Sequence, residues 1–208
     1  MPIGLGAGVK PTRGFLLQLK KRVSFIEEGY RLLELKRDEL ANELRANLEE
    51  LSAKKRKFEE KIEAAFKNLS LAYALLGFKE IVSQAEAVEK NFEIEVLPKS
   101  VMGILVPYLK IVNKPSINNK LGPIARFAAK QFSDLIEDLL KVAELEARIE
   151  RIADDLEKTN RKVNALEKIV IPQYKFIIKQ IEDRLDEDML EEFIRTKFVR
   201  AIIAKRRA

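Results

Sequence analysis

The chain has no cysteine, no histidine and no tryptophan among its 208 residues. Without cysteine it can form neither a disulfide nor a thiolate nucleophile nor a zinc–thiolate site. Without histidine it lacks the commonest general base and transition-metal ligand, and it cannot build a Ser-His triad. It also has no glycine-rich phosphate-binding loop. We therefore expect no catalytic, cofactor-binding or metal-binding residues, and we predict that the chain is not an enzyme.

Long apolar runs are missing as well. No segment has the roughly 20 continuous apolar residues that a membrane-spanning helix needs. The N-terminal stretch MPIGLGAGVKPTRG lacks the apolar core and cleavage pattern of a signal peptide. We expect a cytoplasmic protein that does not insert directly into a membrane.

What the sequence does contain is a long helical pattern between Thr12 and about Ser83, with no proline in it. Apolar residues recur at alternating spacings of three and four, as in Leu16, Leu19, Val23 and Ile26. This spacing is typical of a helix that packs along another helix. Such a helix would be roughly 100 Å long, and we expect Thr12 to cap its start. A helix with a single apolar stripe needs a partner of similar length.

A second helical pattern of the same kind runs from Ile124 to about Lys205 and can supply that partner. Its only proline is Pro172, which removes one backbone donor and clashes with the carbonyl of Lys168, so we expect a kink there. A few polar residues occupy seam positions. Their side chains either reach out of a narrow interface or set the register of the two helices. These residues are Arg37, Asn47, Lys54, Thr159 and Gln173.

The segment between the two helical patterns has a different texture, because four of the seven prolines lie in it or at its edge. The run NFEIEVLP alternates apolar and polar residues, and VMGILVPYLKIV is rich in β-branched residues. We predict a small β-hairpin joined near residues 98–102. Its apolar residues could pack near Leu75, Leu76 and Phe78 or face a partner. The partner-facing candidates are Phe92, Ile94, Val101, Ile104 and Val106.

These patterns predict an all-α dominated fold, a long antiparallel two-helix coiled coil with a small β-hairpin in the middle of the chain. The expected parts are a flexible lead (1–11), a first long helix (12–85), a hairpin and loop segment (86–122) and a second long helix (123–208). If the first helix ends near Ser83 and the second begins near Ile124, the numbers of facing residues add to about 207.

The net charge of +6 is unevenly distributed. Residues 1–24 carry +5 and residues 195–208 carry +6, neither with any acidic residue, whereas the rest of the chain carries −5. An antiparallel pair would bring both ends together, so we expect one basic tip of about +11. The residues expected at this tip are Lys20, Lys21, Arg22, Arg200, Lys205, Arg206 and Arg207.

A basic tip has several possible uses. It could be a solvated surface, a nucleic-acid contact or a basic amphipathic helix on a membrane surface. Few aromatic residues accompany it, only Phe15, Phe193 and Phe198, which disfavours nucleic acid. Another class of protein with an antiparallel helical hairpin and β structure is a prefoldin-like holdase chaperone. A holdase would expose apolar residues at its helix tips, where this chain has mainly cations, although Ile202 and Ile203 are apolar.

Three separate runs of the sequence resemble one known family, and they occur in the family's order. The first is PTRGFLLQLKKRVSFIEEGYRLLELKRDEL, with Pro-Thr-Arg from Pro11 and Leu-Leu-x-x-Lys-Arg-Asp-x-Leu from Leu32. The others are SVMGILVP from Ser100 and KTNRKVNALEKIVIP from Lys158. Together they resemble the D subunit of archaeal A-type and vacuolar V-type ATPases.

The resemblance implies a role as the non-catalytic central shaft of a rotary ATPase. A family member transmits torque between the hexamer of A and B subunits, which handles ATP, and a membrane ring that transports ions such as hydrogen ions. The resemblance places the basic tip in the bore of that hexamer. It implies the F and C subunits as further partners, with the hairpin facing the F subunit or the hexamer's lower rim. The expected location is peripheral, on the cytoplasmic side of the cell membrane.

Overall fold

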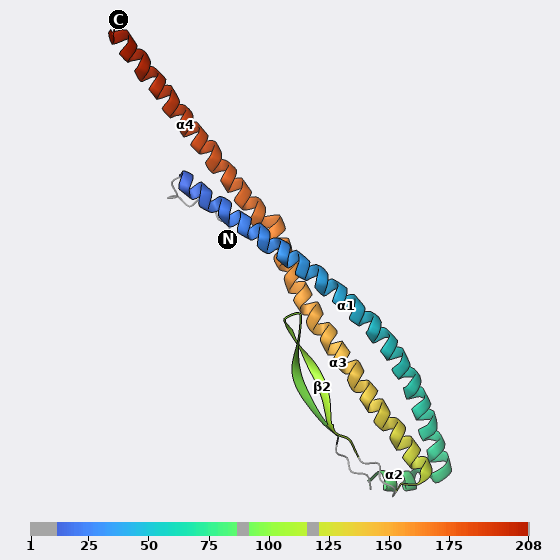
Figure 1. The fold of residues 1–208 in the computed structure, drawn as a ribbon. Coiled ribbons are helices and arrows are strands. Elements are labelled where there is room, and N and C mark those ends of the chain that lie inside the picture. Colours follow the sequence, from blue (N-terminus) through green and yellow to red (C-terminus); the bar gives the residue numbers. More distant parts are fainter. Residues whose placement is uncertain (1–11, 87–91, 116–120, 208) are drawn as a thin grey trace. The chain divides into compact units, whose positions relative to one another are not determined.

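The computed structural model describes residues 12–86, 92–115 and 121–207. The described elements are α1 (Arg13–Leu76), α2 (Phe78–Glu86), β1 (Glu93–Val101), β2 (Ile104–Asn113), α3 (Pro123–Ala165), a π-helical turn η1 (Leu166–Val170) and α4 (Ile171–Arg207) (Figure 1). Long helices with one small antiparallel hairpin confirm the predicted fold class. The lead of residues 1–11 lies outside the described residues.

Both ends of α1 are set by single residues. Thr12 caps the start as predicted, because its Oγ1 accepts a hydrogen bond from the Phe15 N–H at 3.2 Å. The helix ends at Leu76, earlier than expected, because Gly77 adopts a φ of +79° and its N–H bonds the Tyr73 carbonyl at 3.0 Å. This left-handed glycine is a common helix stop, and α2 begins directly after it.

The chain divides into two compact units. The first contains residues up to Asp38 and from Lys158 onward, and the second contains Glu39–Glu157. Each unit therefore includes part of α1 and part of the chain that returns from it.

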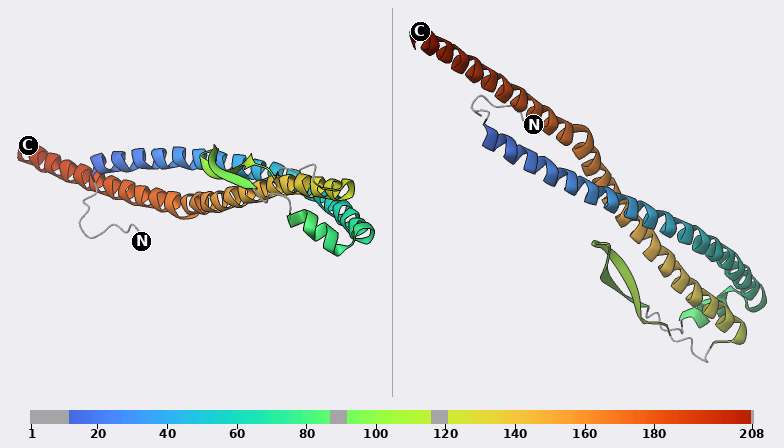
Figure 2. Two further views of the ribbon diagram at one scale, coloured as in Figure 1. Left: turned by 90° about the horizontal axis from the view of Figure 1, so that it is seen from below. Right: turned by 45° about the horizontal axis from the view of Figure 1, so that its top comes forward.

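In the first unit, α1 lies antiparallel to α4, and Figure 2 shows the start of α1 beside it. Ion pairs join Lys20 Nζ to Glu182 Oε1 at 2.6 Å and Lys175 Nζ to Glu27 Oε1 at 2.8 Å. A buried cluster of Leu19, Ile177 and Ile181 lies at the level of the first pair. The numbers of the paired residues add to 202.

In the second unit, α1 lies antiparallel to α3. Asn68 Nδ2 donates to Gln131 Oε1 at 2.9 Å, and the rings of Phe66 and Phe132 meet edge to face at 5.6 Å. These residue numbers add to 198 or 199, so the predicted value of about 207 was wrong. The reason is the early end of α1. Because α1 ends at Leu76 and α3 begins at Pro123, the residue numbers at the two helix ends add to 199 and not to 207. All facing pairs along the two helices shift by the same amount.

The hairpin pairs β1 with β2 through a two-residue turn, Met102–Gly103, whose φ values are +51° and +80°. Two successive positive values suit the twist of a hairpin, and the second falls on a glycine. The two prolines, Pro98 and Pro107, lie directly opposite each other. Counting outward from the turn, this is a non-hydrogen-bonded position, so neither missing N–H weakens the pairing.

Pro172 acts where the sequence predicted a distortion. The turn η1 precedes it, and the Ile171 N–H bonds the Leu166 carbonyl, one residue further back than in an α-helix. The wider turn relieves the clash between the proline ring and the Lys168 carbonyl.

Candidate functional site

The basic residues near the start of α1 do not join those at the end of α4. Lys20 is paired with Glu182, while Lys21 and Arg22 are exposed on α1 at the same level. Arg200 follows Glu182 by 18 residues, which is about 27 Å along a helix. The expected merged tip of +11 was therefore wrong, because the two helices do not end at the same level.

An acidic band lies between the two basic groups. Residues 182–192 carry seven carboxylates and one arginine, for a net charge of −6. This band includes the partner of Lys20, so the basic start of α1 faces opposite charge within the first unit. The sequence contained this signal, but the prediction of a merged tip did not use it.

The end of α4 extends past the beginning of α1. Arg13, the first residue of α1, has its guanidinium beside the sulfur of Met189. From Leu190 to Arg207 the helix continues for about 27 Å. Every side chain between Leu190 and Arg206 is exposed in the described structure. We call residues 190–207 the α4 extension; the side chain of Arg207, one of the predicted tip residues, is outside the description.

The α4 extension combines basic and apolar side chains. Its large apolar residues are mostly about half exposed or more, and Phe193 and Phe198 are each 68% exposed. Their spacing distributes them around the whole helix instead of along one stripe. A helix that is apolar on all sides is typical of one enclosed by other chains, and exposed apolar surface marks interaction sites. The apolar set is Leu190, Phe193, Ile194, Phe198, Val199, Ile202 and Ile203.

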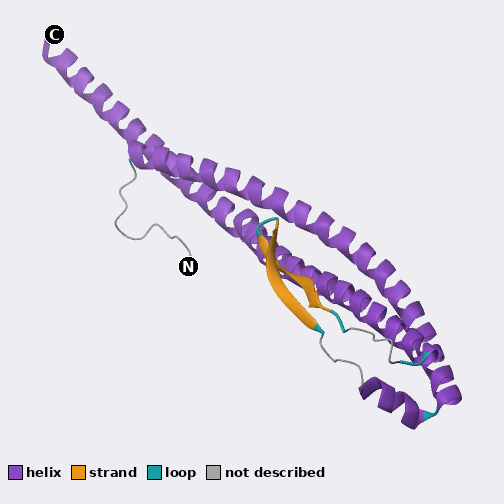
Figure 3. Cartoon of the chain, turned by 60° about the horizontal axis from the view of Figure 1, so that its bottom comes forward, coloured by secondary structure: helices purple, strands orange, loops and turns teal. Residues whose placement is uncertain are grey.

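The hairpin lies beside α3 (Figure 3). The Leu109 N–H donates to Glu144 Oε2 at 3.5 Å, and Lys114 forms an ion pair with Glu137. This position along α3 differs from the predicted packing near Leu75 and Phe78, which are 63% and 69% exposed.

The five hairpin residues predicted to face a partner have different environments. Val106 is 1% exposed, so its assignment as partner-facing was wrong, and it is a packing residue. Phe92, Val101 and Ile104 are half-buried, and only Ile94, at 41%, is exposed. The prediction missed more exposed apolar residues on the two strands, because each face of the hairpin carries some apolar residues. These are Val96, Leu105, Tyr108 and Val112.

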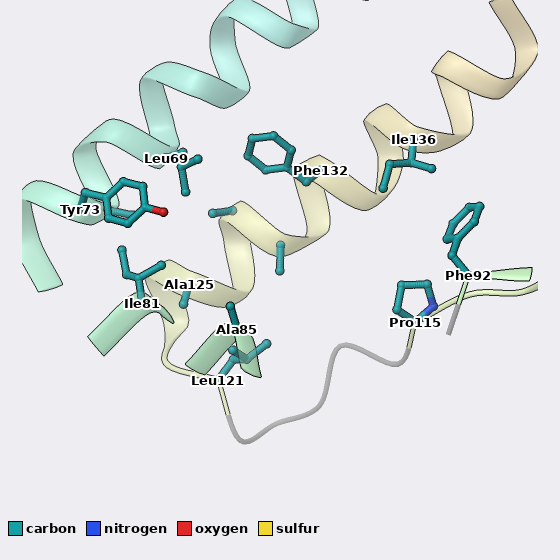
Figure 4. Close-up of a pocket in the computed structure, with 13 residues that line it drawn as sticks. Leu69, Tyr73, Ile81, Ala85, Phe92, Pro115, Leu121, Ala125, Phe132 and Ile136 are labelled. Atoms are coloured by element: carbon teal, nitrogen blue, oxygen red, sulfur yellow. The ribbon is translucent and has the colours of Figure 1, made fainter. Parts of the chain in front are cut away.

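The second unit also contains an apolar pocket of about 570 Å³ that the sequence did not predict (Figure 4). Leu69, Ala72 and Tyr73 of α1 form one wall. The other lining residues come from α2, α3 and the ends of the hairpin segment: Ile81, Ala85, Phe92, Pro115, Leu121, Ala125, Ala128, Ala129, Phe132 and Ile136. Among the described lining residues, none has a charged side chain, and the Tyr73 hydroxyl is the one side-chain polar group. This lining offers neither an acid–base pair nor an anion site.

The charged side chains whose pKa is shifted form ion pairs, either within one helix or between two helices. Hydrogen bonds from Lys61 and Lys141 hold the pKa of the Asp138 carboxyl below its usual value, and the same contact raises the pKa of Lys61. Within the described ranges, no group of three or more acidic residues is placed to hold a metal ion. None of the described helices carries an apolar stretch that could cross a bilayer.

The fold and its surfaces therefore define a class of protein: a coiled-coil protein whose exposed, basic and apolar helix end is suited to contact other chains. Comparison with known proteins gives the particular family. The family model for the D subunit of ATP synthase matches residues 15–201, and the chain belongs to this family.

Relatives from Pyrococcus furiosus, Pyrococcus horikoshii and Methanoregula boonei are each named as the D subunit of an A-type ATP synthase. They are 38%, 35% and 32% identical to this chain. Each alignment covers 93–96% of this chain and 96–97% of the relative.

Proposed function

We propose that this chain is the central rotor shaft of an A-type ATP synthase. It would carry torque between the hexamer of A and B subunits and the ion-translocating ring of the membrane, and it would have no catalytic role of its own. Membership of the family of D subunits supports a place in such a complex. The observation that carries the shaft assignment is the α4 extension, a helix end with exposed apolar and basic side chains on all sides.

The chemistry of the extension fits a bearing. A shaft that turns must meet its surroundings with every face, and the apolar residues of the extension are distributed in that way. Its cations can be attracted to acidic loops without the fixed geometry of a permanent interface. We assign the basic residues of the α4 extension to the hexamer bore: Arg200, Lys205, Arg206 and Arg207. The basic residues near the start of α1, Lys20, Lys21 and Arg22, lie beside the acidic band and not beside the α4 extension.

The other partners follow from the remaining surfaces. The exposed side of the hairpin and the second unit would bind the F subunit or the lower rim of the hexamer, and the C subunit would link the shaft to the membrane ring. The complex would work on the cytoplasmic side of the cell membrane, and this chain would be peripheral to it. No nucleic acid is required by any of these contacts.

The holdase alternative gains one observation, because Phe198, Ile202 and Ile203 are exposed near a helix end as a client-binding tip requires. The two functions differ in what the extension recognises. A holdase suppresses aggregation of many unfolded proteins, whereas a shaft binds one folded assembly. The family match across residues 15–201 favours the shaft.

Removal of residues 190–208 tests the proposal. The truncated chain should keep its helical pairing, because the described contacts of α1 with α4 end at Met189. It should fail to support ATP-driven rotation of a reconstituted A and B hexamer. Full rotation with the truncated chain would overturn the assignment. Calorimetry on the purified full chain should detect no ATP binding, and micromolar binding would contradict the non-catalytic role.

A further inference from the structure

The first unit contains an irregular turn in the helix that packs along α1, at the junction of α3 and α4. The turn η1 (Leu166–Val170) is π-helical, and Pro172 follows it with no N–H to donate. Irregular turns inside a long helix often mark hinges, and proline interrupts the hydrogen-bond ladder.

The facing helix, α1, has a residue of low helix propensity opposite this turn. The pair Glu27–Lys175 fixes the alignment there, and the residue sum of 202 places Gly29 opposite Gln173. Gly29 is in the interior of α1, where glycine is the least favourable residue after proline. Packing does not require it, because apart from the adjoining backbone of α1 no described atom lies within 4 Å of the position where a Cβ would be.

The interface between these two weak points is thin. No residue of α1 from Ser24 to Asp38 is buried, and none from Asn164 to Phe176 is buried on the facing side. The seam residues Ile26, Leu33 and Val170 are only half-buried. Fully packed layers flank this stretch, with Leu19, Ile177 and Ile181 on one side and Val163, at 0% exposed, on the other.

Polar groups take part of the space that a core would fill. The hydroxyl of the half-buried Tyr30 donates to Glu34 Oε1 at 3.3 Å. Partial burial, and then the nearby carboxylates of Glu167 and Glu34, raise the pKa of Tyr30 above its usual value. The Tyr30–Glu34 hydrogen bond runs along α1, so it does not join the two helices.

We propose that this level, residues 24–38 of α1 together with 164–176 of the facing helix, is a mechanical joint at which the first unit bends and opens before its flanking layers do. Low burial, a helix-weakening glycine and an irregular turn are properties of segments with low local stability. The joint follows from the coiled coil alone. Its use as an elastic element that stores torque rests on the proposed rotor function.

Hydrogen exchange on the full chain tests the joint without any partner. Amides in 24–38 and 164–176 should exchange faster than those around Leu19 and Ile181. Gly29→Ala should slow exchange in both joint segments roughly three- to fivefold, because alanine strengthens the helix where space is free. The matched control is Gly14→Ala, a helical glycine of the same unit where an added Cβ would also meet no atom within 4 Å. Equal protection across the unit, or no greater effect of Gly29→Ala than of the control, would overturn the proposal.

Distance measurements give a second, independent readout. Because the chain has no cysteine, spin labels can be placed at chosen pairs of positions. Labels at Lys162 and Lys179 span the turn and Pro172, and labels at Asp134 and Arg151 span the same number of residues in continuous α3. The first pair should give the broader distance distribution, and Pro172→Ala should narrow it. Equal widths for the two pairs would show a rigid helix and contradict the joint.

Discussion

Two isoleucines of α4 should respond very differently to truncation. Ile181 is 2% exposed in the cluster with Leu19 and Ile177, whereas Ile202, in the α4 extension, is 52% exposed. Ile181→Ala removes three buried carbon atoms, worth about 2.4 kcal/mol at about 0.8 kcal/mol each. A residual cavity adds to this loss, so we expect a cost of about 2–5 kcal/mol. Ile202→Ala should cost less than about 1 kcal/mol, because the side chain is already half exposed and alanine favours the helix.

The two variants should then reverse their order in an assembly assay. Urea unfolding followed by circular dichroism at 222 nm should shift for Ile181→Ala and hardly change for Ile202→Ala. Binding to a reconstituted A and B hexamer should weaken more for Ile202→Ala than for Ile181→Ala, and adding Phe198→Ala to Ile202→Ala should weaken it further. Equal unfolding midpoints for the two single variants would refute the assignment of one residue to a folded core and the other to a free surface.

Three further predictions concern charge, pH and the hairpin. Reversing the charges of Arg200, Lys205 and Arg206 together should weaken hexamer binding and reduce its salt dependence. Each single reversal should change the binding free energy by only about 0–1 kcal/mol. Unchanged binding and an unchanged salt response of the triple variant would count against electrostatic attraction. The pKa of Asp138 is lowered from its ordinary value of 3.8 by its two lysine partners, so its contribution of up to about 1 kcal/mol is present above pH 3.8 and lost as the pH falls through the lower folded value. Acid unfolding of Asp138→Asn should lack this step, and an identical pH profile for the wild type and the variant would exclude it. Replacing residues 92–111 with a short linker should leave helical content largely intact but reduce partner binding or rotation; collapse of the helices would make the hairpin a fold element, and wild-type rotation would make it dispensable.

The elements of this fold follow from local patterns in the sequence. The three-four spacing of apolar residues predicts the long helices, and the alternation of apolar and polar residues predicts the hairpin. Its turn, Met102–Gly103, lies at the end of the predicted range 98–102, because residues 98–101 belong to β1. Thr12 and Pro172 act as their chemistry predicts, one as a cap and one as a cause of distortion. In each case the cause and its effect lie within a few residues of each other.

The relations between distant segments were harder to predict. The register depended on where α1 ends, and the predicted helix continued to about Ser83 although Gly77 ends it. That early end lowered the residue sum of the facing pairs. The prediction also placed the start of α1 and the end of α4 at the same level. It therefore did not include the α4 extension or the acidic band of residues 182–192. The buried face of the hairpin could not be chosen from sequence, since both faces carry apolar residues and only the packing on α3 distinguishes Val106 from Leu105.

The most direct test of the shaft is to watch this chain turn. A single cysteine introduced at an exposed position away from the hairpin, for example Lys79→Cys in α2, can carry a bead on a complex whose A and B hexamer is fixed to a surface. We expect the bead to rotate in one direction with ATP, and to stop when residues 190–208 are removed. A bead that stays fixed relative to a hexamer that is hydrolysing ATP would contradict the central claim.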